Sequence, residues 1–438
     1  MVSATTTKFQ GIVFAMIDRR ARLELLVRRA VERVRADTLL RAARPAIDEV
    51  CQGRPPLLLA VGKAAPAMAG ALAADLPALA PGSLVTAVTD AGQMARALRV
   101  VSGDHPLPGL ASAHAAHAAL AALASTAAAT PILLALSGGA SAAWCAPAAD
   151  LKVDEVAAAT RVLMQRGATI QQLNCVRRHL SAIQGGWLAA HAAPRPLLTL
   201  ALVDIVDGAP HDVGSGPGVG DPTSHSDALA VVDALTARTD LPPAIVHHLM
   251  RGADGALPAN PQPDDPALVA ARFFAIATPA TLRDVLRETA VELGLPLEVD
   301  RALISGRVEP LADALANWVR GARSGQMRGL VGEITLTLPA HPGRGGRAHH
   351  LALAVAARLR DLNRHWALIA VGSDGLDGNS GAAGTCIDDA LVARIDDSTL
   401  EQALTSADSA TLLAKLGAQI VTGPTGTNLT DVIAIDVD

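Results

Sequence analysis

The chain has 438 residues, with 37 basic and 42 acidic side chains and a formal net charge of −5 at pH 7. At roughly 150 residues per domain, this length predicts two or three domains, or one large α/β body with a satellite. The sequence shows no concentration of Lys and Arg of the kind that neutralises nucleic-acid phosphates. With four Phe, four Trp and no Tyr, it also has few aromatic rings on which bases could stack. We therefore expect no nucleic-acid partner.

The hydrophobic fraction of 50% comes largely from alanine, which favours helices and is only a weak lipid partner. Residues 106–149 contain no Asp, Glu, Lys or Arg, but prolines and the Gly138-Gly139 pair interrupt them. We expect an Ala-rich helix followed by a buried strand there, and no membrane span. The N-terminus shows no secretory signal pattern. Four Cys without a CxxC pair indicate reduced thiols, a cytoplasmic location and no structural zinc site.

In chain order, residues 11–44 come first and carry a helical pattern with one apolar and one charged face. Short apolar runs then alternate with Ala-rich segments of helix length. The runs are Leu57 to Val61, Leu84 to Val88, Ile132 to Leu136 and Leu197 to Val203. Such alternation is typical of a parallel sheet covered by helices on both faces, so the first domain is predicted to be Rossmann-like. Ligands are expected at the carboxyl ends of its strands.

A stretch with six prolines between Leu241 and Pro266 predicts a linker or surface loop. Beyond it, strands are expected at 273–277, 334–338 and 367–371, and helices near 281–293 and 348–359. The Thr/Leu alternation at 334–338 indicates a half-exposed strand in a mixed sheet. We therefore predict two non-identical α/β domains, residues 1–260 and 267–438, with the active site in the cleft between them.

Small-residue loops that follow apolar runs are the candidate sites. The first, Val61 to Ala65, places Lys63 between a strand and a helix, where free backbone N–H groups and a cation suit an anion. It lacks the flanking residues of a Walker loop. The alternative interpretation is a solvated lysine in an ordinary turn.

The second loop, Ser137 to Ser141, combines two glycines with two hydroxyls, which suits phosphate oxygens. A plain tight turn is one alternative. Another makes Ser141 a hydrolase nucleophile, although Ala143 stands where the nucleophile-elbow motif has glycine.

The third loop carries Asp204 and Asp207 after an apolar run, and paired carboxylates of this kind are plausible Mg²⁺ ligands. The glycines that follow do not form GxGxxG, which weighs against a dinucleotide-dependent enzyme.

The fourth loop, Gly343 to Arg347, holds glycine-flanked arginines suited to phosphate or carboxylate contacts, or is a surface turn. The last group, Ser373 to Gly378 and Thr422 to Asn428, places Asp, Thr and Asn side chains after apolar runs.

Taken in order from about residue 60 to 431, these segments resemble the glycerate 2-kinase family. Its C-terminal part is called the MOFRL domain, and its members were often labelled hydroxypyruvate reductases. The matching segments are Val61 to Ala65, Gly103 to Pro108, Leu136 to Gly139, Leu173 to Ser181, Ser215 to Pro217, Asp221 to Thr223, Gly343 to Arg347, Asp374 to Gly378 and Thr422 to Asn428. The resemblance implies a kinase that uses ATP and Mg²⁺ to phosphorylate the 2-hydroxyl of D-glycerate. We expect a cytoplasmic monomer or homodimer whose partner is a small hydroxy acid.

The resemblance also implies residue roles. Lys63 and Arg347 would be the catalytic pair on the transferred phosphate, in agreement with the cationic stabilisation that phosphoryl transfer needs. The implied nucleotide and phosphate contacts are Ser137, Gly138, Gly139, Ser141, Gly345, Gly346 and Thr425. The implied substrate contacts are His105, Asn174 and Arg177. The implied Mg²⁺ ligands are Asp204 with Asp207 or Asp374.

Four family loops depart from the usual pattern at Ala140, Val203, Ile334 and His349. In the plain interpretation, His349 and His350 are helix-surface residues. Because a site that hydrogen-bonds a hydroxyl rejects analogues strongly, the departures leave open a same-fold kinase for another hydroxy acid or hydroxylated metabolite. A non-catalytic binding protein and an NAD(P)H-dependent hydroxypyruvate reductase are the further alternatives.

Overall fold

The computed structural model describes residues 18–88, 90–206 and 208–438. The described chain forms two compact units, which we call the N-terminal unit, Ala36–Ile276, and the C-terminal unit, residues 18–35 together with Ala277–Asp438. These bounds differ from the predicted domains, 1–260 and 267–438. The strand after the proline-rich stretch completes the first sheet, and the first described helix packs on the second sheet.

The N-terminal unit is built on a six-stranded sheet in the order β3-β2-β1-β4-β5-β6. The strands are β1 (Leu57–Gly62), β2 (Leu84–Ala87), β3 (Arg99–Ser102), β4 (Ile132–Leu136), β5 (Leu197–Leu202) and β6 (Ala271–Ala277). β1 to β5 pair in parallel, and every residue of β1, β4 and β5 is buried. Continuous apolar runs form such strands because helices cover both faces. The predicted Rossmann-like sheet is confirmed.

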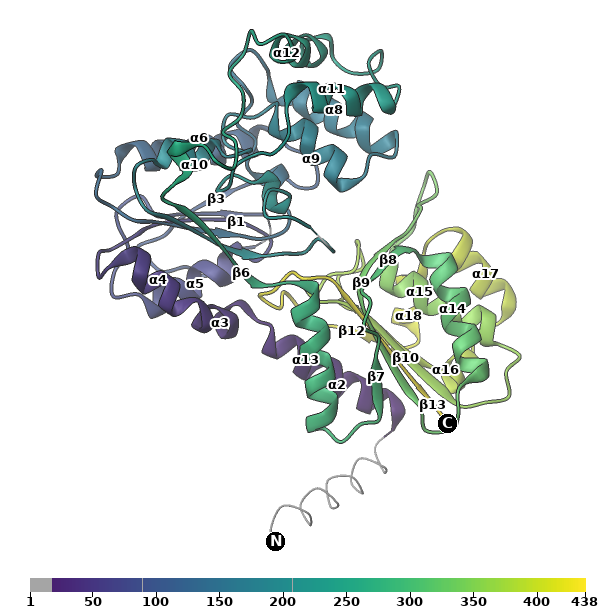
Figure 1. Ribbon diagram of the computed structural model, residues 1–438. Coiled ribbons are helices and arrows are strands. Elements are labelled where there is room, and N and C mark those ends of the chain that lie inside the picture. Colours follow the sequence, from purple (N-terminus) through teal and green to yellow (C-terminus); the bar gives the residue numbers. More distant parts are fainter. Residues whose placement is uncertain (1–17, 89, 207) are drawn as a thin grey trace. The chain divides into compact units, whose positions relative to one another are not determined.

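Helices lie on both faces of this sheet (Figure 1). On one face are α3 (Ala36–Leu39), η1 (Leu40–Ala43), α4 (Arg44–Cys51) and α5 (Ala65–Asp75). On the other are α6 (Leu110–Ser125) and α10 (Trp187–Ala192). The uncharged stretch 106–149 thus forms α6, the buried strand β4 and the short helix α7 (Ala140–Ala143), as expected. No described helix combines the length and apolar character that crossing a membrane requires.

Four further helices of the N-terminal unit surround a hydrophobic core of their own (Figure 1). They are α8 (Val153–Gln165), α9 (Ile170–Arg178), α11 (His225–Ala234) and α12 (Pro243–Ala253), and the short turns η2 (Val213–Ser215) and η3 (Pro266–Leu268) complete the unit. The prediction of a linker or surface loop at 241–266 is wrong for its first half, because α12 lies there, whereas residues 254–265 form neither a helix nor a strand. Proline is tolerated in the first helical turn, and Ile245 and Leu249 then bury one face of the helix.

The C-terminal unit has a seven-stranded sheet in the order β12-β11-β10-β13-β9-β7, with β8 paired to β9. The strands are β7 (Leu297–Val299), β8 (Ile304–Arg307), β9 (Met327–Thr335), β10 (Trp366–Gly372), β11 (Gly384–Asp388), β12 (Gln419–Ile420) and β13 (Asp431–Val437). β7 and β8 run parallel to β9, whereas the other pairs are antiparallel, which confirms the mixed sheet. The strand expected at 334–338 begins and ends earlier. Leu338 is 57% exposed and lies beyond the last residue of β9 that is paired.

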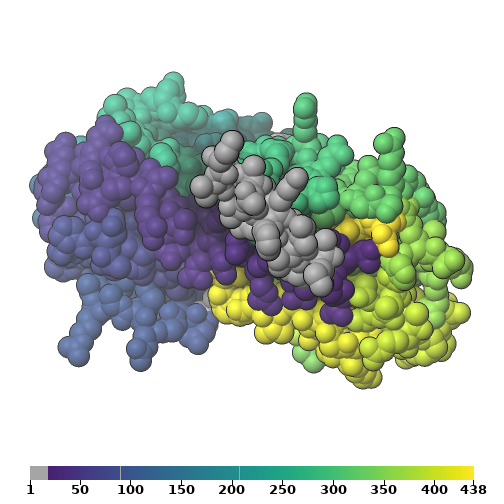
Figure 2. Space-filling view, turned by 90° about the horizontal axis from the view of Figure 1, so that it is seen from below, coloured from purple at the N-terminus to yellow at the C-terminus, as the bar shows by residue number. Residues whose placement is uncertain are grey.

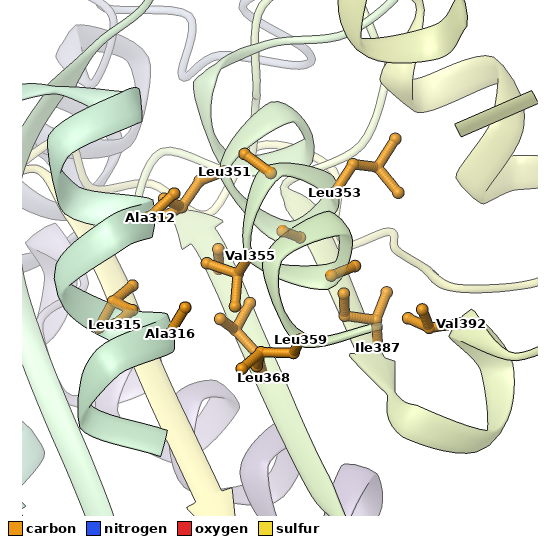
Figure 3. Packing of buried hydrophobic residues seen from close by; sticks show 14 of the residues in the cluster. Ala312, Leu315, Ala316, Leu351, Leu353, Val355, Leu359, Leu368, Ile387 and Val392 are labelled. Atoms are coloured by element: carbon orange, nitrogen blue, oxygen red, sulfur yellow. The ribbon is translucent and has the colours of Figure 1, made fainter. Parts of the chain in front are cut away.

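Helices cover both faces of the second sheet (Figure 1). One face carries α14 (Val308–Gly321), α15 (Arg347–Leu359), α16 (Asp389–Val392), α17 (Asp397–Thr405) and α18 (Ser409–Lys415). The other carries α2 (Arg19–Arg33) and α13 (Pro279–Glu292). Figure 3 shows Leu315 and Ala316 of α14 near Val355 and Leu359 of α15 and Leu368 of β10.

The helix predicted over 11–44 is divided in the structure. Residues 11–17 lie outside the described part, α2 ends at Arg33, and the helices after Ala36 belong to the other unit. In Figure 2 the purple residues of α2 lie beside the yellow C-terminal residues. Arg22 Nη2 donates to Asp436 Oδ2 at 2.6 Å, and this ion pair joins α2 to β13.

Candidate active site

The loops that follow β1 and β4 are locked together around Gly62. The Lys63 backbone N–H donates to the Gly138 carbonyl at 2.9 Å, and the Ala64 N–H donates to Ser137 Oγ at 3.1 Å. Gly62 has φ of +115°, and a Cβ there would lie 2.4 Å from Ser137 Oγ. Only glycine fits, so this contact fixes where the Lys63 loop lies. The Ser137 hydroxyl is fully buried and occupied by backbone groups, so its role toward a nucleotide stays a prediction.

We expect Gly62→Ala to lower turnover at least about tenfold and to destabilise the fold by roughly 1–3 kcal/mol, because the added methyl overpacks the loop. Steady-state kinetics and urea unfolding measure the two effects. Gly53→Ala is the matched control, because Gly53 also has positive φ, +73°, but nothing lies within 4 Å of its Cβ position. Equal turnover of the two variants would contradict the role given to the loop.

Gly139 brings two of the predicted site residues together. It has φ of +87°, and a Cβ there would lie 3.1 Å from His105 Cδ2 and 3.5 Å from Lys63 Cγ. Lys63 is half-buried and His105 is exposed. The segments after β1, β3 and β4 therefore bring a lysine, an imidazole and a glycine turn together, which is an arrangement suited to an anion.

A chain of polar side chains continues from the same loop. Ser215 Oγ lies 2.9 Å from Ser141 Oγ and 3.1 Å from Asn174 Oδ1, and Arg177 Nη1 lies 3.4 Å from that same Asn174 oxygen. Ser215 and Asn174 are buried. Ser141 thus bonds to a serine and to no described histidine, which removes the support for a hydrolase nucleophile. Ser215 was not predicted as a site residue, although it stands in a family motif.

Arg177 and Arg178 have opposite environments. Arg178 is buried and donates from Nε to Asp221 Oδ1 at 2.9 Å, so its charge is paired inside the protein. Arg177 is half-buried, and in the described part of the chain no carboxylate lies within ion-pair distance of it. Burial lowers the pKa of Arg177 to about 10, which leaves it cationic at neutral pH. A cation with no carboxylate partner beside Asn174 is suited to an external anion.

In the C-terminal unit the decisive pair is Arg347 and Asp431. Arg347 begins α15, and its Nε donates to Asp431 Oδ2 at 2.6 Å. The Arg347 side chain is 37% exposed, while Asp431 is buried and its Oδ1 has no partner among the described residues. Burial raises the pKa of Asp431 to about 6, against the opposing effect of Arg347. Burial alone would lower the pKa of Arg347. The attraction and the hydrogen bond of the Asp431 carboxylate act in the opposite direction, and the pKa of Arg347 is raised overall.

Only the Nε of Arg347 bonds to a described protein acceptor, so both terminal guanidinium nitrogens remain for another anion. Asp374 and Asp377 add to the negative potential around this arginine. Asp374 is half-buried, and its loop bonds to the next one through Thr425, whose N–H donates to the Asp374 carbonyl at 3.3 Å. Arg347, Asp374 and Thr425 therefore lie in one unit, and the roles that the family resemblance implies for them stay predictions.

The glycine loop before Arg347 packs on the loop that holds Asp377. The Gly345 N–H donates to Asn379 Oδ1 at 2.7 Å, and a Cβ on Gly346 would lie 2.3 Å from Asp377 Oδ1. Because the Gly345 N–H already has a partner, phosphate binding by Gly345 and Gly346 stays a prediction.

Asp377 closes the N-terminus of α15. Its Oδ1 accepts from the Ala348 N–H at 3.0 Å, and its Oδ2 accepts from the His349 N–H at 2.9 Å and from His349 Nδ1 at 2.6 Å. The interpretation of His349 and His350 as helix-surface residues is wrong, since they are 0% and 5% exposed. His349 is a buried partner of the capping carboxylate, which the sequence pattern did not reveal.

We expect Asp377→Asn to destabilise the C-terminal unit by about 2 kcal/mol, because it weakens a buried cap with three hydrogen bonds. Urea unfolding followed by circular dichroism measures the loss. Asp361→Asn, at an exposed position just after α15, is the control and should change stability by less than about 0.5 kcal/mol. Equal stabilities of the two variants would contradict the capping role.

The expected metal ligands lie in different units. Asp204 follows β5 in the N-terminal unit, Asp374 follows β10 in the C-terminal unit, and Asp207 lies outside the described residues. Within the described ranges, no group of three or more His, Cys, Asp or Glu side chains could hold a metal. All four cysteines are buried and unpaired.

Comparison with known proteins identifies the family. Residues 22–250 match a family model described as "Domain of unknown function (DUF4147)", and residues 329–431 match the MOFRL family. The chain is 31% identical over 393 residues to a putative hydroxypyruvate reductase of Agrobacterium vitis, with 86% of each chain covered. It is 27% identical over 385 residues to the glycerate 2-kinase of Pyrococcus horikoshii, again with 86% of each covered. The protein belongs to the glycerate 2-kinase family.

A solved relative has the same fold as this family member. The glycerate kinase of Thermotoga maritima superposes with a TM-score of 0.80 at 24% identity, over 96% of this chain and 99% of that one. Members of the glycerate 2-kinase family are small-molecule kinases, and this protein is a small-molecule kinase of that family. Of its predicted residues, Lys63 and His105 lie near Gly139, whereas Asp374 lies near Arg347.

Proposed function

We propose that the protein transfers the γ-phosphoryl group of ATP to the 2-hydroxyl of D-glycerate, giving 2-phosphoglycerate and ADP in the cytoplasm. The observation that carries this proposal is Arg177, a half-buried cation without a described carboxylate partner, next to the Asn174 amide and the Ser215 hydroxyl. A guanidinium beside neutral hydrogen-bonding groups is suited to a small acid that also carries hydroxyls.

In this proposal, Arg177 and Asn174 hold the carboxylate of glycerate, and Lys63 and Arg347 act on one phosphoryl group during turnover. The 2-hydroxyl oxygen forms a bond to the γ-phosphorus while the bond to the bridging oxygen of ADP breaks, and the hydroxyl proton is released. Phosphoryl transfer is accelerated mainly by positioning and by cations on the phosphoryl oxygens. The two terminal nitrogens of Arg347 and the Lys63 ammonium are suited to this work.

A magnesium ion that arrives with the nucleotide needs only one or two protein carboxylates, because phosphates and waters complete its coordination. Asp204 and Asp374 are both half-buried and follow strands, so the donor set fits such an ion better than a cage made of protein alone. When bound, Mg²⁺ would neutralise charge on the nucleotide phosphates.

The positions where this chain departs from its family support an unchanged substrate. Ala140, Val203, Ile334 and His349 are all buried, with exposures of 2%, 6%, 2% and 0%. Ile334 belongs to the main core of the C-terminal unit, and His349 bonds to Asp377. These substitutions therefore alter packing behind the loops and leave Arg177 and Asn174 in place.

The proposal is tested by measuring ADP release from ATP and Mg²⁺ with D-glycerate, L-glycerate, tartronate, hydroxypyruvate, glycolate and longer sugar acids. Phosphorus NMR of the product then assigns the phosphorylated hydroxyl. We expect turnover with D-glycerate and a 2-phosphate product. Turnover with only another acid would show that D-glycerate is not the substrate. No ADP release with any acid of the panel would favour a non-catalytic binding protein, and NADH oxidation with hydroxypyruvate would favour a reductase.

We expect Arg177→Leu to raise the KM for D-glycerate about 10- to 100-fold, because a charge-assisted hydrogen bond contributes about 1.5–3 kcal/mol. The KM for ATP should change little. Arg166→Leu, an exposed arginine at the end of α8, is the control. An unchanged KM for D-glycerate in Arg177→Leu would remove the carboxylate role.

A further inference from the structure

A cavity of about 390 Å³ opens among the helices of the N-terminal unit, and none of the predicted site residues lines it. Its wall is rich in rings, although the chain has only eight Phe and Trp residues in all. The ring-bearing residues of the wall are His179, Trp187, His191, His225 and His248. The volume lies in the range of small-molecule sites, which are usually apolar clefts with a few oriented polar groups.

Two imidazoles in this wall have unused hydrogen-bonding atoms. His225 is 6% exposed, and neither of its ring nitrogens bonds to a described residue. His179 is 2% exposed, and its Nδ1 has no partner within the described chain. Buried polar atoms are usually satisfied, and unsatisfied ones at a cavity indicate a missing partner.

The bonds of His179 determine what that partner must supply. The Thr223 hydroxyl donates to Asp221 Oδ1 at 2.7 Å, so its oxygen accepts from His179 Nε2 at 3.1 Å. In this tautomer Nδ1 carries a lone pair and needs a donor. The His179 and His225 rings lie 4.6 Å apart, so they share one part of the wall.

Charge is paired at this cavity. His248 Nε2 lies 2.9 Å from the His179 carbonyl oxygen, and His248 Nδ1 lies 2.7 Å from Asp150 Oδ1. The other carboxylate oxygen, Asp150 Oδ2, lies 3.2 Å from Arg251 Nη1. Burial lowers the pKa of His179 to about 4 and lowers that of His225, so both imidazoles are neutral near pH 7. Among the described wall residues, Arg251 is paired with Asp150, so a ligand beside His179 and His225 meets flat faces and neutral donors and acceptors.

We propose that this cavity binds a purine ring. A purine is flat, stacks on rings such as Trp187, and carries both donors and acceptors on its edge for His179 and His225. Two sources share this chemistry, namely the adenine of ATP and a free purine nucleoside that acts as an effector. The first source rests on the proposed kinase function. A nucleoside effector would act on the proposed substrate contacts through α9, because this helix carries Asn174 and Arg177 and is followed by His179 of the cavity wall.

Isothermal titration calorimetry of the full chain with adenosine tests the proposal without any turnover. We expect binding to the wild type, and at least tenfold weaker binding to His225→Leu and to Ala182→Phe, which fills the cavity from its wall. His247→Leu, an exposed histidine next to His248 on α12, should bind as the wild type does. Circular dichroism confirms that each variant is folded.

Adenosine that binds the wild type and both cavity variants equally, or that fails to bind the wild type at about 10 mM, would overturn the purine site. Where adenosine binds and competes with ATP in the kinetic assay, the cavity holds the base of the nucleotide. Where it binds and leaves the KM for ATP unchanged, the cavity is a separate effector site. Binding with no kinase activity on any acid supports the site and counts against the proposed function alone.

Discussion

Replacing Lys63 by methionine is expected to lower kcat by roughly 10²- to 10³-fold while the protein stays folded. The substitution keeps an unbranched side chain that reaches as far as Cε and removes the ammonium, so the loop anchored by Gly62, Ser137 and Gly138 should persist. Preorganised cations and donors aimed at developing charge contribute effects of this size when they are removed. Steady-state kinetics with saturating ATP and D-glycerate give kcat, and thermal unfolding reports the fold.

The control is Lys152→Met, since Lys152 is exposed just before α8 in the same unit and its side chain makes no capping bond. Its kcat should stay within about twofold of the wild type. If Lys63→Met also stayed within a few fold, the lysine would be a solvated residue of a strand-to-helix turn, and the catalytic pair would be wrong.

Replacing Arg347 by methionine should abolish measurable turnover, with a loss of roughly 10³-fold or more, as expected when a cation that stabilises a phosphoryl transition state is removed. It should also destabilise the protein by about 3 kcal/mol at pH 8, because the buried Asp431 carboxylate loses its counter-ion. Activity and stability therefore fall together in this variant, and a second substitution is needed to separate them.

Arg347→Met combined with Asp431→Asn provides that separation. The neutral amide removes the buried charge, so stability at pH 8 should recover while turnover stays lost. Arg358→Met, a partly exposed position further along α15 that pairs with Glu309 and Asp313, should keep turnover within a few fold. Recovery of turnover in the double variant would show that Arg347 acts only by neutralising Asp431.

The pH dependence of stability gives an independent check of this pair. Burial raises the pKa of Asp431 to about 6 in the folded protein, above the value of about 3.9 in an unfolded chain. Between these values the folded state binds more protons, so the contribution of Asp431 to stability falls as pH rises from about 4 to 6 and is constant above that. Asp431→Asn should remove this fall in unfolding experiments over the same range.

The local hydrophobic pattern of the sequence was sufficient to predict most strands of the first sheet. The apolar runs that became β1, β2, β4 and β5 are buried on both faces, and such strands are continuous in sequence. The strand β3 was not predicted, because most of its residues are exposed and its sequence, Arg99–Ser102, therefore contains no long apolar run. The linker or surface loop predicted at 241–266 was wrong for the residues of α12, because prolines at the start of that helix resemble those of a loop.

For the candidate site, the sequence by itself determined which loops are candidates for the chemistry, because glycines at tight turns and polar residues after apolar runs are local features that a family preserves in order. Lys63, Gly139 and Arg347 were predicted in this way, and Arg177 was predicted from the family resemblance. Only the tertiary structure decided which groups remain available: Ser215 joins Ser141 to Asn174, and Asp431 takes the Nε of Arg347 from 84 residues away. Burial and hydrogen-bond pairing depend on segments distant in the chain, and local periodicity carries no record of such partners.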